Sequence, residues 1–376
     1  MNPVIANTDL ISGYGHGLDA CWSALLAGHT AIRPAGRFAG RGFLSENAAT
    51  VPGLDDADGP SRLMAMLAPL LASVAAEAPA DADLILATTT GEIDLLEASV
   101  LRGQGSPADS VPLRLLEKVQ RRLHLRGSAS VVSAACASSC VAIGQAAARI
   151  ASGRASAVVV VAGDALSEFV FSGFSTLMAL SPDRARPFDR QRDGLSLGEA
   201  AAWALVMDPE RARQERRPVI AEIAGWGCAG DANHMTGPSR DGDGLARAIR
   251  LCLGPDRLAG RDIGAVCAHG TGTVYNDAME LKALRTVFGE RPVPVFSVKG
   301  GTGHTLGAAG LLEVLIAAKV LQTGIVPPTP GLREPDAEAE GWVATAACAL
   351  AKGAAVLSTN SGFGGVNAAV ALRARS

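Results

Sequence analysis

Residues 130–153 read SVVSAACASSCVAIGQAAARIASG, and residues 295–324 read VFSVKGGTGHTLGAAGLLEVLIAAKVLQTG. In both stretches a short apolar run, typical of a buried strand, is followed by a reactive side chain and a helix-like segment rich in alanine and glycine. The reactive residue is Cys136 in the first stretch and His304 in the second. This similarity predicts two duplicated halves whose small-residue helices pack closely and whose helix starts share one cleft.

The rest of the chain alternates between apolar strand-like runs and helix-like stretches. Such alternation is typical of a layered α/β fold, in which helices cover both faces of a sheet. We expect one half at 1–210, which carries Cys136, and another at 211–376, which carries two candidate histidines and a glycine-rich loop near its end. The expected strands are 84–88, 130–134, 157–162, 201–207, 219–225, 265–268 and 354–359.

Composition excludes several classes of protein. Of the 376 residues, 48 % are hydrophobic and 19 % are charged, which supports a large buried core and argues against disorder. The formal net charge of −3 lacks the basic surplus of a nucleic-acid-binding protein. The opening residues, MNPVIANTDL, do not resemble a signal peptide, and no unbroken apolar run approaches the ~20 residues of a membrane span. We therefore expect a cytoplasmic protein that binds neither nucleic acid nor membranes.

The seven cysteines form an odd set without the spacing of a disulfide framework or a zinc site, so no metal is expected. Cys136 differs from the others because a strand precedes it and a helix follows it. At a helix N-terminus, backbone N–H groups and the helix dipole favour a thiolate and can hold an oxyanion, which suits a nucleophile that accepts an acyl group. An inert buried cysteine is the alternative. Cys140, one helical turn later, is expected to be a packing residue.

Two histidines stand in glycine-rich segments at expected strand ends. His269 lies in VCAHGTGT, where Thr271 and Thr273 can hydrogen-bond an amide-rich ligand arm. His304 lies in KGGTGHTLGAAG, with Lys299 five residues before it. A P-loop is excluded because this lysine precedes the glycines and no GK[ST] closes the run. One cysteine with two histidines suits a reaction in which negative charge builds on a carbonyl oxygen, because each neutral imidazole can donate a hydrogen bond to that oxygen.

Five segments together resemble the β-ketoacyl synthases of the thiolase superfamily, the condensing enzymes of fatty acid and polyketide synthesis. In chain order they are AACASS, ALSPDRARPFDRQRDGLSLGEAAA, HGTGTVYNDAME, SVKGGTGHTLGAAG and GFGGVN. The resemblance covers nearly the whole chain. It implies a thiolase-like five-layer αβαβα fold from two duplicated halves and a discrete, type II, 3-oxoacyl-acyl carrier protein synthase, which is an acyltransferase.

The resemblance also implies partners. One is an acyl carrier protein, which carries the 4′-phosphopantetheine group, so that no cofactor belongs to the chain itself. The other is a second copy of the chain, as a homodimer, or a related ketosynthase or chain-length-factor subunit, as a heterodimer.

Each candidate residue receives a role from the resemblance. Cys136 would be the acylated nucleophile, while His269 and His304 would bind the malonyl thioester carbonyl and stabilise the enolate left when carbon dioxide departs. Lys299 would tune the electrostatics of the site. The other implied residues are Phe363 (gate and, with the Cys136 N–H, oxyanion hole), Thr271, Thr273 and Thr236 (phosphopantetheine arm), Asp277 and Glu280 (support), and Thr90 and Phe174 (acyl pocket).

Departures from the family pattern favour a specialised pathway over primary fatty acid synthesis. Ala134 stands where the family usually has threonine, and Ser361 stands where a second phenylalanine often precedes the gate. Val274 and Tyr275 replace a frequent Pro-Leu pair.

Other functions on the same fold stay open. Acyl transfer to an oxygen or nitrogen nucleophile would need Cys136 and one general base, but not two histidines that bind an enolate. A non-catalytic partner subunit usually lacks the cysteine. A biosynthetic thiolase would need a second catalytic cysteine in a glycine-rich motif, and Cys348 lacks that setting.

Overall fold

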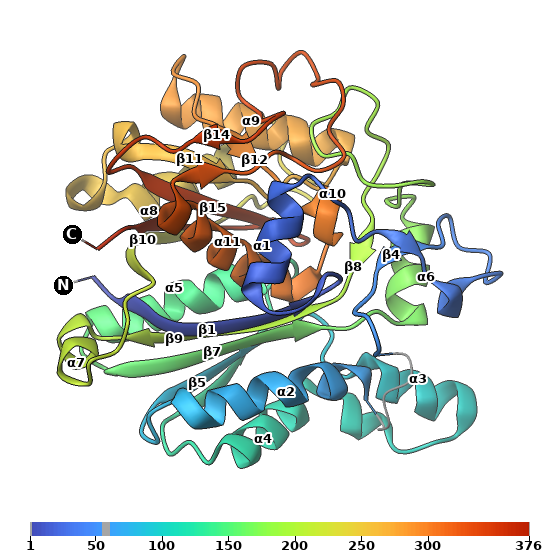
Figure 1. The fold of residues 1–376 in the computed structure, drawn as a ribbon. Coiled ribbons are helices and arrows are strands. Elements are labelled where there is room, and N and C mark those ends of the chain that lie inside the picture. Colours follow the sequence, from blue (N-terminus) through green and yellow to red (C-terminus); the bar gives the residue numbers. More distant parts are fainter. Residues whose placement is uncertain (1, 55–60, 376) are drawn as a thin grey trace.

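The computed structural model describes residues 2–54 and 61–375 (Figure 1). The strands are β1 (Val4–Ser12), β2 (Gly15–His16), β3 (Arg33–Pro34), β4 (Asn47–Ala49), β5 (Asp83–Ala87), β6 (Ala129–Val132), β7 (Ala157–Asp164), β8 (Leu197–Gly198), β9 (Ala200–Met207), β10 (Ala221–Gly230), β11 (Ile263–Cys267), β12 (Val295–Phe296), β13 (Ile325–Val326), β14 (Cys348–Ala349), β15 (Ala355–Gly362) and β16 (Val366–Arg373). The main sheet runs in the order β12-β11-β15-β16-β10-β1-β9-β7-β5-β6, with β2 paired to β1 beside this path.

Helices connect these strands. The α-helices are α1 (Leu18–Leu26), α2 (Arg62–Glu77), α3 (Ile93–Arg102), α4 (Pro112–Leu123), α5 (Ser138–Ala151), α6 (Glu168–Thr176), α7 (Pro209–Gln214), α8 (Asp243–Arg257), α9 (Val274–Phe288), α10 (Lys299–Thr302) and α11 (Ala309–Thr323). Short 3-10 turns lie at η1 (Gly36–Phe38), η2 (Pro107–Ser110), η3 (Gly260–Asp262) and η4 (Leu306–Ala308).

The pairing of β1 with β10, at Val4 with Glu222 and Ile5 with Ala221, joins two halves of the same topology. In chain order the first half has β1, β5, β6, β7 and β9, and the second has β10, β11, β12, β15 and β16. Both lie in the spatial order 3-2-4-5-1. In each half the second, third and fourth strands are parallel, and the fifth runs antiparallel to both neighbours. The duplicated architecture expected from the sequence is confirmed, while the boundary between 1–210 and 211–376 stays a prediction.

Helices form three layers around the two halves of the sheet (Figure 1). The pair α5 and α11 lies between the halves, α2 and α4 cover the outer face of the first half, and α8 and α9 cover that of the second. The β7 sequence AVVVVAGD is apolar throughout because both faces of the strand are covered. Val158 and Val160 pack into the central core, whereas Val159 and Val161 pack against the outer helices. This is the five-layer αβαβα fold predicted from the sequence.

Small side chains let α5 and α11 touch. A Cβ atom on Gly310 would stand 2.5 Å from the backbone nitrogen of Cys140 and 2.7 Å from its Cβ. Across the same contact, the backbone N–H of Leu311 donates a hydrogen bond to the Ser139 hydroxyl at 2.8 Å. Cys140 is buried within this contact, which confirms the prediction that it is a packing residue.

The structure corrects two expectations. The strands β1 and β16 were missed, because polar residues such as Asn7 and Asp9 interrupt the apolar pattern of β1 and because β16 directly follows the glycine-rich loop. The second concerns membrane-spanning length: although no apolar run of that length is unbroken, Leu306–Thr323 is long and apolar enough to cross a membrane, with 78 % of it buried. Glu313 and Lys319 hid this segment from a search for unbroken runs. Its burial between the two halves of the sheet is that of a core helix.

Candidate active site

A tight turn places Cys136 just before α5. Ala135 has a φ of 48°, in the left-handed region that residues other than glycine rarely adopt. The Ser138 hydroxyl holds this turn, since it donates to the Ala135 carbonyl at 2.6 Å and accepts from the Ala134 N–H at 2.8 Å. Cys136 is 5 % exposed and lines a cavity of about 470 Å³. The turn thus brings a buried thiol to the wall of a cavity.

Burial dominates the ionisation of Cys136. It raises the pKa of the thiol to about 12, while Lys299 and the backbone N–H groups of Phe363 and of Cys136 itself oppose the rise. Burial therefore favours the neutral thiol in the free site, against the preference for a thiolate that a helix N-terminus gives. Cys136 precedes the first residue of α5 by two positions, and desolvation outweighs the effect of the helix end. The two N–H groups that act on the sulfur are the pair expected to form an oxyanion hole.

Alkylation of Cys136 by iodoacetamide should report this high pKa. Because the thiolate is the reactive form, we expect the rate to rise about tenfold per pH unit between about pH 7 and pH 9. The measurement follows the mass of the protein over time, with Cys136→Ala subtracting alkylation of the exposed cysteines. A rate that levels off within this range would contradict the assignment of a raised pKa.

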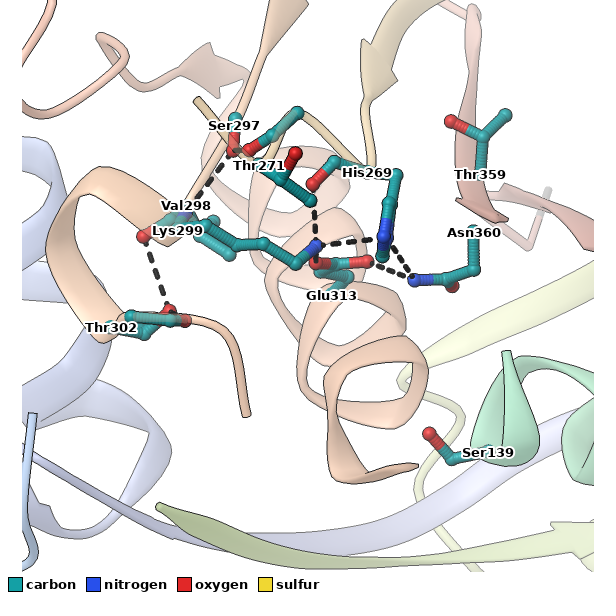
Figure 2. Close-up of polar contacts among 12 residues, drawn as sticks. Ser139, His269, Thr271, Ser297, Val298, Lys299, Thr302, Glu313, Thr359 and Asn360 are labelled. Carbon is teal, nitrogen blue, oxygen red and sulfur yellow. Dashed lines mark hydrogen bonds and ion pairs between the residues drawn. The ribbon is translucent and has the colours of Figure 1, made fainter. Parts of the chain in front are cut away.

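Three contacts fix His269, which follows β11, and Figure 2 shows the one between its ring and Lys299. Its backbone N–H donates to Oε1 of Glu280 at 2.7 Å, its ring Nδ1 lies 3.1 Å from Nζ of Lys299, and its carbonyl accepts from the same amine at 2.6 Å. Burial, reinforced by the charge of Lys299 and by His304, holds the pKa of His269 well below its usual range. The ring is therefore neutral at pH 7.

Lys299 is almost completely buried, where an unpaired charge would be costly. Its amine forms an ion pair with Glu313 of α11. Glu313 also accepts a hydrogen bond from Nδ2 of Asn360 at 2.8 Å. Burial raises the pKa of Glu313, and Lys299 opposes that rise. Sequence reasoning missed Glu313 and Asn360, although one acid in an otherwise apolar helix was a usable signal, because a buried charge needs a partner.

His304 lies beside His269 on the cavity wall. The two ring centroids are 5.2 Å apart, with the ring planes at 87°. The backbone of His304 is held at β8, since its N–H donates to the Ser196 carbonyl at 2.7 Å and its carbonyl accepts from Gly198 at 3.0 Å. Burial and Lys299 lower the pKa of His304 well below the usual value. Two neutral imidazoles therefore line the cavity beside a thiol, and each has an N–H to donate.

Two buried carboxylates on α9 support the loop that carries His269. Asp277 accepts a hydrogen bond from the backbone N–H of Thr271 at 3.0 Å. Glu280 accepts from the N–H groups of His269 and Gly270, each at 2.7 Å. Burial raises the pKa of Glu280 to about 7, and these hydrogen bonds oppose the rise. The positions of Asp277 and Glu280 suit the supporting role expected of them.

The cavity opens beside the β15–β16 hairpin. Phe363, at the tip of this hairpin, is 37 % exposed and stacks on Phe174 of α6, with ring centroids 5.7 Å apart. The hydroxyls of Thr271 and Thr273 are 2.9 Å apart. Both threonines line the cavity, as does Thr236. All five side chains therefore line the same cavity as Cys136, and their roles as gate, acyl pocket and pantetheine channel stay predictions.

Thr90 is the exception, because it is not among the described residues that line the cavity. Its backbone N–H and hydroxyl lie 3.2 and 3.4 Å from Oδ1 of Asp164. Asp164 also accepts from the N–H of Gly307 at 2.7 Å, and its charge contributes to the raised pKa of Cys136. Thr90 thus bonds to Asp164, and Asp164 in turn acts on the nucleophile. The place of Thr90 in an acyl pocket stays a prediction.

Known proteins are similar to this chain over nearly its whole length. Residues 118–212 match the family model described as "Beta-ketoacyl synthase, N-terminal domain", and residues 220–333 match "Beta-ketoacyl synthase, C-terminal domain". The chain is 32 % identical, over a 415-residue alignment, to 3-oxoacyl-[acyl-carrier-protein] synthase 2 of Rhizobium meliloti (strain 1021), with 98 % of each chain covered.

Two further comparisons come from polyketide pathways and from a solved structure. The chain is 36 % identical over 271 residues to the tetracenomycin polyketide synthase ketoacyl synthase alpha subunit of Streptomyces glaucescens, which covers 70 % of this chain and 64 % of that protein. The solved structure named "The ishigamide ketosynthase/chain length factor" is similar with a TM-score of 0.87 at 30 % identity, over 100 % of this chain and 99 % of that chain. The fold, the family models and these identities together establish that the chain belongs to the β-ketoacyl synthase family.

Proposed function

We propose that this chain is a β-ketoacyl-acyl carrier protein synthase, an acyltransferase that extends an acyl group by decarboxylative Claisen condensation with malonyl-carrier. The observation that carries the proposal is the convergence of one buried thiol and two neutral imidazoles, Cys136, His269 and His304, on a single cavity. A thiol can hold the acyl group, and two N–H donors suit a carbonyl oxygen that becomes an enolate.

In the first step, the sulfur of Cys136 attacks the carbonyl carbon of an acyl thioester on the carrier. A C–S bond forms to Cys136, the C–S bond to the carrier breaks, and the thiol proton ends on the departing carrier thiol. No net base is consumed, which is compatible with a thiol of raised pKa. The N–H groups of Cys136 and Phe363 would hold the oxyanion of the tetrahedral intermediate.

In the second step, the malonyl carboxylate leaves as carbon dioxide, and its bonding electrons form an enolate. The enolate oxygen would accept hydrogen bonds from His269 and His304. The enolate carbon then attacks the acyl carbonyl, a C–C bond forms, the C–S bond to Cys136 breaks, and the released sulfur takes up one proton. Burial keeps both imidazoles neutral, and Lys299 favours this chemistry because its positive charge adds to that effect.

The carrier would supply the only prosthetic group in this scheme. Thr236, Thr271 and Thr273 line the cavity and would hydrogen-bond the phosphopantetheine arm of the carrier. The name of the Rhizobium relative includes an acyl carrier protein, which supports this choice of partner. A cytoplasmic location stays a prediction.

An exposed apolar face supports a protein partner of a second kind. None of the residues of α3, all of which the structure describes, is fully buried, and Val100 and Leu101 are 70 % and 66 % exposed. Leu113 of α4 and Phe169 of α6 add exposed apolar side chains nearby. Such a surface is typical of a subunit interface. A second copy, or a related subunit as in the ketosynthase/chain-length-factor pair, would cover it.

The area around the gate supports a specialised fatty acid or polyketide pathway. Ser361 donates a hydrogen bond to Oδ1 of Asn367 at 2.7 Å, and Nδ2 of Asn367 donates to Asp231 at the same distance. A small polar side chain therefore stands where the family often has a second phenylalanine. The space this leaves beside Phe363 would admit acyl groups other than a plain saturated chain.

Intact-protein mass spectrometry tests the proposed function. The protein is incubated with an acyl-carrier thioester and then with malonyl-carrier, while the masses of protein and carrier are followed. We expect Cys136 to gain the acyl mass and the carrier then to show the β-ketoacyl product. Loading followed by transfer to an oxygen or nitrogen acceptor would instead identify an acyltransferase. Failure to load, in the presence of an active synthase partner, would identify a non-catalytic subunit.

Enlarging Thr90 tests the acyl-pocket assignment. If the acyl chain extends past Cys136 toward the loop held by Asp164, Thr90→Phe should fill that space and shorten the longest acyl group accepted. The measurement is the rate of Cys136 loading across a series of acyl-carrier chain lengths. Thr90→Ser, which keeps the hydroxyl near Asp164, is the matched control. An unchanged chain-length profile in Thr90→Phe would remove Thr90 from the pocket.

A further inference from the structure

Asn360 is a buried polar side chain that none of the steps above uses. It lies on β15, and its neighbour Thr359 donates to Oε1 of Glu280 at 2.8 Å. Figure 2 shows Asn360 beside His269 and Glu313, on the opposite side of the histidine ring from the Lys299 stem. Its Nδ2 lies 2.8 Å from Oε2 of Glu313 and 3.3 Å from Nδ1 of His269.

The neighbours determine which end of the Asn360 amide faces them. Glu313 is paired with the Lys299 cation and acts as an acceptor, so that the amide must present its NH₂ group. That group has two hydrogens, one for Glu313 and one for Nδ1 of His269. The other amide atom, Oδ1, has no hydrogen-bond partner among the described residues. A buried carbonyl oxygen without a hydrogen bond costs stability. Its presence here indicates that the two hydrogen bonds donated by the NH₂ group matter more than one accepted by Oδ1.

Lys299 presents a second donor to the same ring nitrogen. Its ammonium group has three N–H bonds, and its three acceptors are Oε1 of Glu313, the carbonyl of His269 and Nδ1 of His269. Neither an ammonium nor an amide NH₂ can accept a hydrogen bond. Nδ1 of His269 must therefore present its lone pair, and the single proton of the neutral ring belongs on Nε2.

We propose that Asn360 is a positioning residue that, together with Lys299, keeps the ring proton of His269 on Nε2. This inference rests on the proposed function, in which His269 acts as a hydrogen-bond donor to the enolate oxygen. Because Asn360 lies on β15 and Lys299 on α10, the two donors hold the angle of the ring as well as its tautomer. It also ties the ring to Glu313, the counter-ion of Lys299, so that all four side chains form one connected unit (Figure 2).

The substitution Asn360→Asp tests this role, because aspartate has the same shape but accepts where asparagine donates. A carboxylate beside Nδ1 should draw the ring proton of His269 to that nitrogen and leave a lone pair on Nε2. Nitrogen-15 spectra of the full-length protein labelled at histidine report which ring nitrogen is protonated, and His269→Asn assigns the signals. We expect Nε2–H in the wild type and protonated Nδ1 in the variant.

The Asn360→Asp substitution should also reduce one of the two activities of the enzyme much more than the other. Decarboxylation of malonyl-carrier by Asn360→Asp should fall about 100-fold, as it does when a donor to a developing oxyanion is removed. Acyl loading of Cys136, which does not use His269 as an enolate donor in this scheme, should change far less. A variant that had merely lost its fold would lose both activities together.

A wild-type His269 protonated on Nδ1 would overturn the proposal, and so would an Asn360→Asp variant whose ring proton stays on Nε2. If that variant does not fold, Asn360→Leu takes its place, since it has a similar size, no charge and no donor; a share of Nδ1–H should then appear. The spectra require no turnover. Wild-type protein that fails to decarboxylate malonyl-carrier would therefore contradict the proposed function and leave the tautomer result to stand separately.

Discussion

Replacing Cys136 with alanine should abolish acyl loading and lower the rate of condensation by about 10,000-fold or more, as expected for loss of a catalytic nucleophile. The sulfur is the atom to which the acyl group is bonded between the two steps, so no neighbouring side chain can stand in for it. Intact-protein mass spectrometry after incubation with acyl-carrier measures loading, and the carrier mass after addition of malonyl-carrier measures condensation.

Cys140→Ala is the matched control for this prediction. Cys140 lies four residues later, is buried in the first turn of α5 and packs against Gly310 of α11. The control removes a buried thiol four residues from the nucleophile without touching the cavity, and it should load normally. A Cys136→Ala protein that still gains the acyl mass would move the nucleophile to another residue.

Replacing His304 with alanine should slow decarboxylation of malonyl-carrier by about 100- to 1,000-fold, the usual effect of losing one oxyanion donor. Loading of Cys136 should suffer much less, because that step uses the backbone N–H groups near the sulfur. The low pKa of His304 also predicts how decarboxylation depends on pH. Because the ring stays neutral as the pH falls, His304 itself should cause no loss of decarboxylation from about pH 8 to about pH 6, whereas an ordinary histidine would become charged near pH 6.5. Glu280, whose pKa is about 7, titrates in this range in wild type and in His304→Ala alike.

His29→Ala, at an exposed histidine outside the cavity, controls for effects of the substitution itself. The comparison is made on released carbon dioxide and, separately, on acyl mass gained by the protein. A His304→Ala variant that loses loading more than decarboxylation would reverse the role given to this residue. A collapse of decarboxylation between pH 7 and pH 6 that occurs in wild type but not in the residual activity of His304→Ala would show that the ring is not held neutral.

Much of the fold could be predicted because strands that are buried on both faces have a simple apolar signature. The apolar runs 84–88, 157–162 and 201–207 correspond to β5, β7 and β9 within a few residues. By contrast, β1 escaped because it lies between β9 and β10, where main-chain pairing rather than an apolar run defines it. Its polar side chains also bond locally, as when the Thr8 N–H donates to Asn7 at 2.7 Å.

The candidate site could be predicted where residue types and glycine-rich segments identify it, as for Cys136 and the two histidines. The ionisation of Cys136 could not, because it depends on how completely the fold removes water from the sulfur. Asn360 could not be predicted either, since its contacts join β15 to a loop and a helix that are distant in sequence. Local sequence identifies reactive groups, whereas their charge and tautomer depend on the assembled fold.

The contact between α5 and α11 limits how this chain can be recombined with its relatives. Where the Gly310 backbone meets that of Cys140, there is no space for a methyl group. The first turn of α5, which follows the nucleophile, packs against α11 at this contact. A substitution on one helix must therefore be matched on the other. In chimaeras, the two helices have to be exchanged together, although they belong to different halves, and a crossover between the halves would place mismatched partners in the central layer.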